Sequence, residues 1–146
     1  MAERAQVTSV EAVDIKTMHG MAPQWLAGCR LRECWLEPTF HKYAGKLCAG
    51  IQIHVDDTAY DHAAFRPWRL QALAFKGLRH QLPDYPLWRN FPYEYVFDRL
   101  AIDVINGSPL LREWVDDSRA MPEDLETITR VDEQAWEEER SAFLLY

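Results

Sequence analysis

Residues 35–55 of the chain read WLEPTFHKYAGKLCAGIQIHV, and the second half of this stretch decides the fold around it. From Ala49 to Val55 the side chains alternate strictly. Because successive side chains of a strand point to opposite faces, this pattern predicts a strand with two unlike faces. One face carries Ala49, Ile51, Ile53 and Val55, and the other carries Gly50, Gln52 and His54. We expect the first face to enter a core and the second to present Gln52 and His54 side by side.

A second short strand is predicted just upstream, at Arg32–Glu37, and it pairs most naturally with the first. Pro38 ends it, because proline has no N–H to give to a ladder. The polar segment 39–46 between the two strands carries His41, Lys42 and Tyr43. Two strands joined by a polar loop predict one wall of a binding cleft.

Outside the strands, the punctuation by proline and glycine predicts helices. A helical turn is expected within 23–31, and the best helix runs from Pro67, which suits a first helical position, to Leu82. Tyr93, Tyr95 and Phe97 alternate as a third strand. Further helices are predicted at 101–105, from 109 to about 118, from 122, and from 129 onward. The predicted fold is α+β: a small mixed or antiparallel sheet packed with helices, with a helical C-terminal third.

Charge and hydropathy exclude some classes of function. The net charge is −7, and residues 113–140 carry eleven acidic and three basic side chains, so no basic stripe is available to bind nucleic acid. No apolar run is long enough for a membrane span, and residues 1–6 lack the layout of a signal peptide. The chain as given is therefore expected to be cytoplasmic, or to be a piece of something longer.

Three cysteines, Cys29, Cys34 and Cys48, form no CxxC pair and are interpreted as buried free thiols. Zinc binding by these thiols with His41 or His54 is the alternative, but the spacing matches no standard site. We expect neither a metal nor a cofactor.

Six polar residues near the quoted stretch are the candidate binding residues: Thr39, His41, Lys42, Gln52, His54 and Arg66. Two alternatives stay open. The face of His54 can pack under a helix, with the imidazole bonded to a backbone carbonyl. Arg66 precedes a helix N-terminus, where the dipole disfavours a cation, so it is held either for an anion or in a salt bridge to Asp56 or Asp57.

Two further groups of side chains have a functional and a structural interpretation. Glu37 and Glu94 are carboxylates on predicted strands that could serve acid–base chemistry, but surface charge is the better interpretation of both. Six aromatic residues could form sugar-binding platforms, but we expect them in the core: Trp35, Phe40, Tyr43, Trp68, Trp88 and Tyr93.

Several separated motifs in one order resemble a known family. The run from Glu37 to Val55 is followed by Phe65-Arg66-Pro67, Tyr93-Glu94-Tyr95, Arg99 to Asp103, Asn106-Gly107-Ser108, Leu111-Arg112, Trp136 and Leu144-Leu145-Tyr146. Together they resemble the C-terminal domain of the peptidoglycan exo-β-N-acetylmuramidases of the NamZ type. The resemblance covers residues 22–146, and residues 1–21 are interpreted as a poorly defined segment or linker remnant.

The resemblance implies an enzyme, without a cofactor, that removes terminal N-acetylmuramic acid from peptidoglycan fragments in bacteria. It also implies two domains, of which the N-terminal one supplies the catalytic carboxylate and the cleft lies between them. The resemblance covers only the C-terminal domain, so we expect the catalytic half to be missing here, assign no catalytic residue to this chain and expect it to be inactive alone. The alternatives are a stand-alone carbohydrate- or partner-binding module, and a subunit that docks on a separate catalytic domain.

Overall fold

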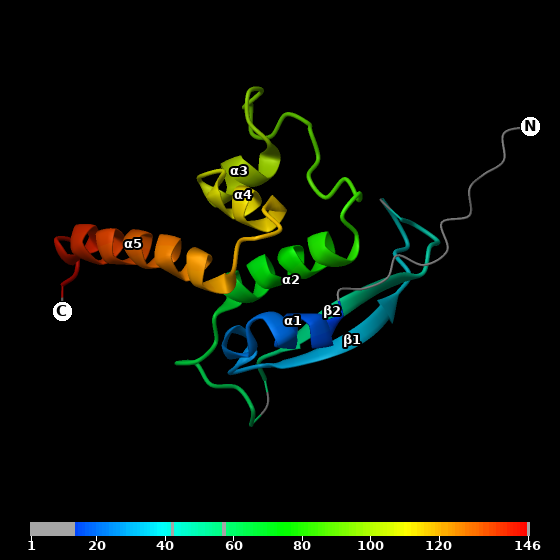
Figure 1. Cartoon of the computed structure of the whole chain (residues 1–146), viewed down its shortest axis with the longest axis horizontal. Helices are drawn as coiled ribbons and strands as arrows, with labels where there is room; N and C mark the ends of the chain where they lie inside the picture. Colours follow the sequence, from blue (N-terminus) through cyan, green and yellow to red (C-terminus); the bar gives the residue numbers. More distant parts are fainter. Residues whose placement is uncertain (1–13, 42, 57, 146) are drawn as a thin grey trace, which may run out of the picture. The chain divides into compact units, whose positions relative to one another are not determined.

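The computed structural model describes residues 14–41, 43–56 and 58–145, and the chain divides into two compact units, Met1–Pro83 and Asp84–Tyr146. The elements follow the order α1 (Ile15–Met21), η1 (Pro23–Leu26), β1 (Arg30–Leu36), β2 (Cys48–His54), α2 (Pro67–Gln81), α3 (Ala101–Asn106), α4 (Leu110–Asp116) and α5 (Pro122–Ser141) (Figure 1). The first five belong to the first unit. The α+β prediction is confirmed, with helices alone in the C-terminal third.

The core of the first unit lies among α1, η1 and α2. The carboxylate of Asp14 accepts the Lys16 N–H at 2.9 Å and caps α1, and Met18 on that helix is fully buried. The helical turn predicted within 23–31 forms η1, which buries Trp25 and Leu26. The helix predicted from Pro67 is confirmed as α2, whose most buried residues are Leu70, Ala72 and Leu73. Within the segment 1–21, Ile15–Met21 thus form a capped helix.

The two predicted strands pair as an antiparallel hairpin, with Arg30 opposite His54 at one end and Leu36 opposite Cys48 at the other. The alternation of the faces is confirmed by this register. The expectation of a core beneath the apolar face is wrong, because no residue of β1 or β2 is buried. Among the described residues, the sheet has these two strands only.

The base of the hairpin is fixed to the loop that follows β2 by a close contact of two backbones. The Asp61 N–H donates to the carbonyl of Gly28 at 3.1 Å, and the Phe65 N–H donates to the carbonyl of Asp61 at 2.9 Å. A Cβ on Gly28 would lie 2.6 Å from the Asp61 carbonyl oxygen and 2.7 Å from the Phe65 nitrogen. Gly28 also has φ +78°, so both the close contact and the backbone conformation favour glycine at this position.

In the second unit, α3 and α4 form a short helical pair that Gly107 separates, with φ +82°, a conformation that glycine adopts readily at the end of a helix. The residue before α4 is Pro109, and no side chain caps the start of this helix with a hydrogen bond. Leu111, Trp114 and Val115 of α4 are buried together with Leu125 of α5. The core of this unit therefore lies where α4 meets the start of α5.

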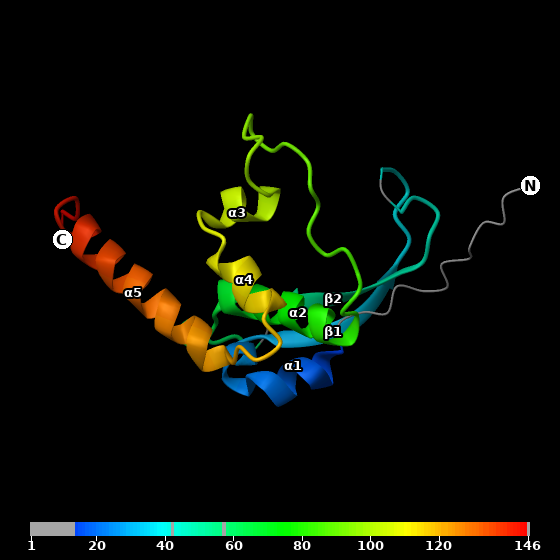
Figure 2. The same cartoon turned by 45° about the horizontal axis from the view of Figure 1, so that its top comes forward.

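The helices predicted from Pro122 and from Thr129 are one continuous helix, α5. Thr129 was expected to open a new helix, but its hydroxyl donates to the Leu125 carbonyl at 3.0 Å, the residue one turn earlier. From Arg130 to Ser141 every residue of α5 is exposed, and this part extends away from α3 and α4 (Figure 2). Trp136 is 60% exposed, so the apolar positions of this part lie in solvent.

The third predicted strand is wrong. Instead, Tyr93 and Val96 pair in a tight two-residue turn, in which each N–H donates to the other carbonyl, at 3.3 and 2.9 Å. The central residues Glu94 and Tyr95 have φ +48° and +66°, which non-glycine residues adopt at a cost. Tyr95 is 91% exposed. Alternating aromatics here mark a turn because no neighbouring strand is available to pair with them among the described residues.

Replacing Glu94 with asparagine and Tyr95 with glycine is expected to stabilise the second unit by about 1 kcal/mol, because Asn-Gly favours two positive φ angles. The comparison is with Tyr95→Ala, which removes the same ring but keeps a Cβ at positive φ. Urea denaturation measures the difference. A double variant no more stable than Tyr95→Ala would show that the turn is unstrained.

The three cysteines are free but half-buried, not buried as predicted. Burial raises the pKa of the Cys29 thiol, whose sulfur lies 3.6 Å from the Leu26 carbonyl oxygen.

In the described ranges, no helix combines the length and apolar character needed to cross a bilayer.

Candidate functional site

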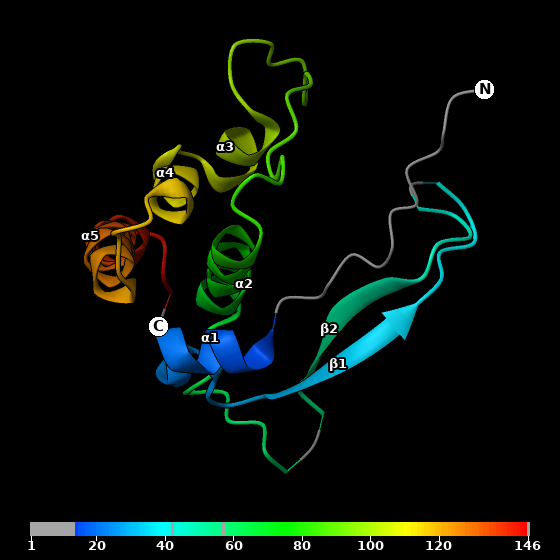
Figure 3. The ribbon, with the colours of Figure 1, turned by 45° about the vertical axis from the view of Figure 1, so that its right-hand side comes forward.

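The hairpin has one polar and one apolar face, because residues that are opposite in an antiparallel pair point the same way. The polar face carries Arg30 with His54 and Arg32 with Gln52. Arg32 Nη2 donates to Gln52 Oε1, so the amide that was predicted to face a ligand is oriented by a guanidinium. This face carries no Asp or Glu within the two strands. Figure 3 shows the hairpin as one twisted ribbon.

The apolar face is open to solvent over much of its area. It carries Leu31, Glu33, Trp35, Ala49, Ile51 and Ile53. Trp35 is 59% exposed and Ile53 is 39% exposed. An isolated two-stranded hairpin is only marginally stable in water, and contiguous exposed apolar side chains are typical of interaction surfaces. This face is therefore a candidate interaction surface.

The loop at the tip of the hairpin adds further exposed rings to this surface. Thr39 and His41 are exposed, and Phe40, 71% exposed, contacts the His41 ring edge-on with centroids 5.0 Å apart. Tyr43 and His41 have φ +62° and +59°, so the loop holds two bulky residues in the left-handed region. Gly45 N–H donates to the Pro38 carbonyl at 2.9 Å and closes the loop.

The remaining candidate residues lie at the other end of the hairpin. His54 Nδ1 is 3.8 Å from Asp56 Oδ1, and the two side chains form an ion pair only when the imidazole is protonated. Arg66 precedes α2, and its Nη1 donates to the carbonyls of Ala63 and Phe65 at 2.6 and 3.3 Å. Backbone carbonyls thus hold the guanidinium that was expected to bind an anion or to pair with Asp56.

The five candidates that the structure describes lie in two groups. Thr39 and His41 lie at the tip, whereas Gln52, His54 and Arg66 lie toward the base. The six residue steps of β2 between the two ends correspond to about 20 Å. Lys42 and Asp57 lie outside the described residues. Sequence reasoning missed Arg30 and Arg32, which only the strand register places beside His54 and Gln52.

The expected burial of the aromatic residues is wrong for four of them: Trp35, Phe40, Tyr43 and Trp68 are exposed, and Trp88 and Tyr93 are half-buried. The carboxylates Glu37 and Glu94 are both exposed, Glu37 just after β1 and Glu94 in the tight turn. Neither has a structural environment that marks it as an acid or a base.

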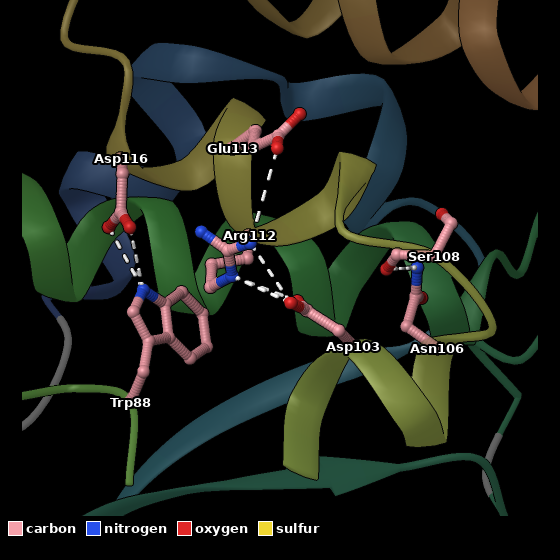
Figure 4. Close-up of polar contacts among 7 residues, drawn as sticks. All are labelled: Trp88, Asp103, Asn106, Ser108, Arg112, Glu113 and Asp116. Atoms are coloured by element: carbon pink, nitrogen blue, oxygen red, sulfur yellow. Dashed lines mark hydrogen bonds and ion pairs between the residues drawn. The ribbon is translucent and has the colours of Figure 1, made fainter. Parts of the chain in front are cut away.

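A polar cluster in the second unit fixes α3 to α4 (Figure 4). The guanidinium of Arg112 donates from Nε and Nη2 to the carboxylate of Asp103, with the closest N–O distances at 2.9 Å. Asp103 is buried, and its hydrogen bond to Arg112 raises the pKa of the guanidinium. Trp88 Nε1 donates to both carboxylate oxygens of Asp116, at 2.9 and 3.0 Å. This cluster is structural, since its polar atoms satisfy one another.

An open groove of the second unit lies between α4 and α5. Its polar lining consists of the carboxylates of Glu113, Asp117 and Asp124 with one guanidinium, that of Arg119. An excess of carboxylates disfavours an anionic ligand there. Between the two, the hairpin with its two arginines is therefore the better candidate site for an anionic ligand.

Comparison with known proteins gives one positive result. A search of the curated proteins and of the solved structures returned no match. A family model does match, the one described as exo-beta-N-acetylmuramidase NamZ, C-terminal, and the match spans residues 6–146, nearly the whole chain. This range includes the hairpin as well as Asp103 and Arg112. The chain belongs to the family of the C-terminal domain of the NamZ exo-beta-N-acetylmuramidases.

Proposed function

We propose that the chain is the smaller, cleft-forming domain of a glycosidase that removes N-acetylmuramic acid from peptidoglycan fragments. In this proposal a separate N-terminal catalytic domain supplies the hydrolytic carboxylate and covers the hairpin, and no cofactor is needed. The observation that carries the proposal is the open apolar face and tip of the hairpin, with Trp35, Phe40 and Tyr43 exposed, in a chain of this family.

The position of the exposed aromatic residues favours this proposal over a stand-alone carbohydrate-binding module. Such a module would place an aromatic platform beside the polar residues that bind sugar hydroxyls. Here Trp35 lies on the face opposite Gln52 and His54, and Phe40 and Tyr43 lie at the tip. An apolar surface separated from the polar face fits the docking of another domain better.

The polar face has the chemistry to contribute to substrate binding. N-acetylmuramic acid carries a carboxylate on its lactyl group, and arginine is well suited to bind a carboxylate. Arg30 and Arg32 lie two residues apart on one face, with Gln52 and His54 opposite them. We assign the lactyl carboxylate to this face.

The test is release of N-acetylmuramic acid from a muramyl–glucosamine disaccharide. The chain alone is expected to release none, while a two-domain member of the family serves as the active control. A chimera that joins this chain to the catalytic half of that member is expected to be active. Release by the isolated chain would contradict the proposal, and Glu37 and Glu94 would then be the first carboxylates to replace.

In the active chimera, Arg32→Ala is expected to raise KM about tenfold or more, since a charge-assisted hydrogen bond contributes about 1.5–3 kcal/mol. Arg119→Ala, which removes an exposed guanidinium from the second unit, is the matched control. Equal KM values for the two variants would remove the polar face from substrate binding.

A further inference from the structure

The outer edge of β2 is open in the described part of the chain. β1 and β2 pair only with each other, and no described backbone group outside the hairpin donates to β2 or accepts from it. Such an edge presents a row of unpaired N–H and C=O groups that can pair with another strand.

The two edges differ in how they are protected. β1 carries three charged residues, Arg30, Arg32 and Glu33, and charged side chains are a common device against edge pairing. β2 reads CAGIQIH and contains no Lys, Arg, Asp, Glu or Pro. A seven-residue strand of low charge without proline is the kind that accepts a further strand. The sequence thus protects one edge and leaves the other available.

β2 is also complementary to itself. With a two-fold axis at Ile51, an antiparallel pair of β2 strands places Ile51 opposite Ile51, Gly50 opposite Gln52, Ala49 opposite Ile53 and Cys48 opposite His54. No two like charges meet. In this register odd residues face odd residues, so the apolar faces of two hairpins lie on one side of the new sheet and the polar faces on the other. Two β1 strands paired about Arg32 or Glu33 would instead bring like charges together.

We propose that two copies of this chain associate through the outer edges of their β2 strands, in an antiparallel pair centred on Ile51. The product is a four-stranded sheet in the order β1, β2, β2, β1. A sheet of three or more strands with an apolar face can be stable where a lone hairpin is marginal. The proposal concerns the edge of the hairpin, so it does not depend on the function proposed for its faces.

The test is disulfide trapping in a background in which Cys29, Cys34 and Cys48 are replaced by serine. At the two-fold axis, the Cα atoms of Ile51→Cys in the two copies lie about 5 Å apart, within the range of a disulfide. Glu33→Cys is the matched control, since Glu33 is opposite Ile51 on the same face. In the four-stranded sheet the two Glu33 positions are separated by three strand spacings, about 14 Å.

Mild oxidation is expected to cross-link Ile51→Cys into a covalent dimer and to leave Glu33→Cys monomeric. Circular dichroism spectra of the two variants serve as the control for folding. Equal cross-linking of both, or none from Ile51→Cys, would overturn the proposal. Sedimentation of the unmodified chain gives an independent readout: a particle of twice the 17.1 kDa chain mass is expected, and a monomer would overturn the proposal. Neither readout depends on hydrolysis, so this inference and the proposed function can fail separately.

Discussion

Replacing Arg112 with methionine is expected to lower the free energy of unfolding of the second unit by about 3–5 kcal/mol. The reason lies with its partner. Asp103 is buried in α3, and Arg112 satisfies both of its carboxylate oxygens through two nitrogens. Without the guanidinium, a buried carboxylate remains without a countercharge, and this costs more than the pair itself contributes.

The control is Arg119→Met, because Arg119 is 91% exposed and its pairing with Asp117, at 3.6 Å, is a surface interaction. Its loss is expected to cost less than about 1 kcal/mol. Amide exchange in α3 and α4, followed by mass spectrometry, measures the effect within the second unit. The double variant Asp103→Leu with Arg112→Met is expected to recover part of the loss. If it is as unstable as Arg112→Met alone, the penalty arises from lost packing and not from an unpaired charge.

Replacing Gly28 with alanine is expected to destabilise the first unit by about 2–4 kcal/mol. The new methyl group would lie within 2.7 Å of two backbone atoms, the Asp61 oxygen and the Phe65 nitrogen, which cannot move aside as a flexible side chain would. Its φ of +78° adds a second penalty for a residue with a Cβ.

Gly20→Ala is the matched control for Gly28→Ala. Gly20 lies in α1, and no atom lies within 4 Å of the position of its Cβ. Alanine there is expected to stabilise the helix by about 0.5–1 kcal/mol. Thermal unfolding of the two variants should therefore shift in opposite directions. A shift in the same direction for both would show that the contact between Gly28 and the 61–65 turn relaxes easily.

The sequence predicted those parts of the fold that local chemistry controls. Pro67 and Gly107 mark the ends of helices because their backbone constraints act whatever surrounds them. The pairing of the two strands followed from period-two alternation. The same alternation at 93–97 gave a wrong strand, since it does not reveal whether a partner strand exists. Nor could it reveal that Trp35 and Ile53 on the apolar face remain exposed.

For the candidate site, the sequence predicted shared faces but not separations. Gln52 and His54 share a face because of the strand period alone. Their partners Arg32 and Arg30 follow only from the register, which depends on the length and shape of the tip loop. The position of Arg66 depends on the 61–65 turn and its contact with Gly28, a tertiary contact between residues distant in the sequence.

The exposed half of α5 has a consequence for the energetics of binding to this domain. An isolated helix of about twelve residues is marginal in water, so residues 130–141 depend on propagation from the anchored turn at Leu125 and Thr129. Helix content should therefore decline gradually along this half, and the exposed Trp136 lies within it. A ligand that holds Trp136 would complete helix formation as it binds, and part of its binding energy would be used to order the chain.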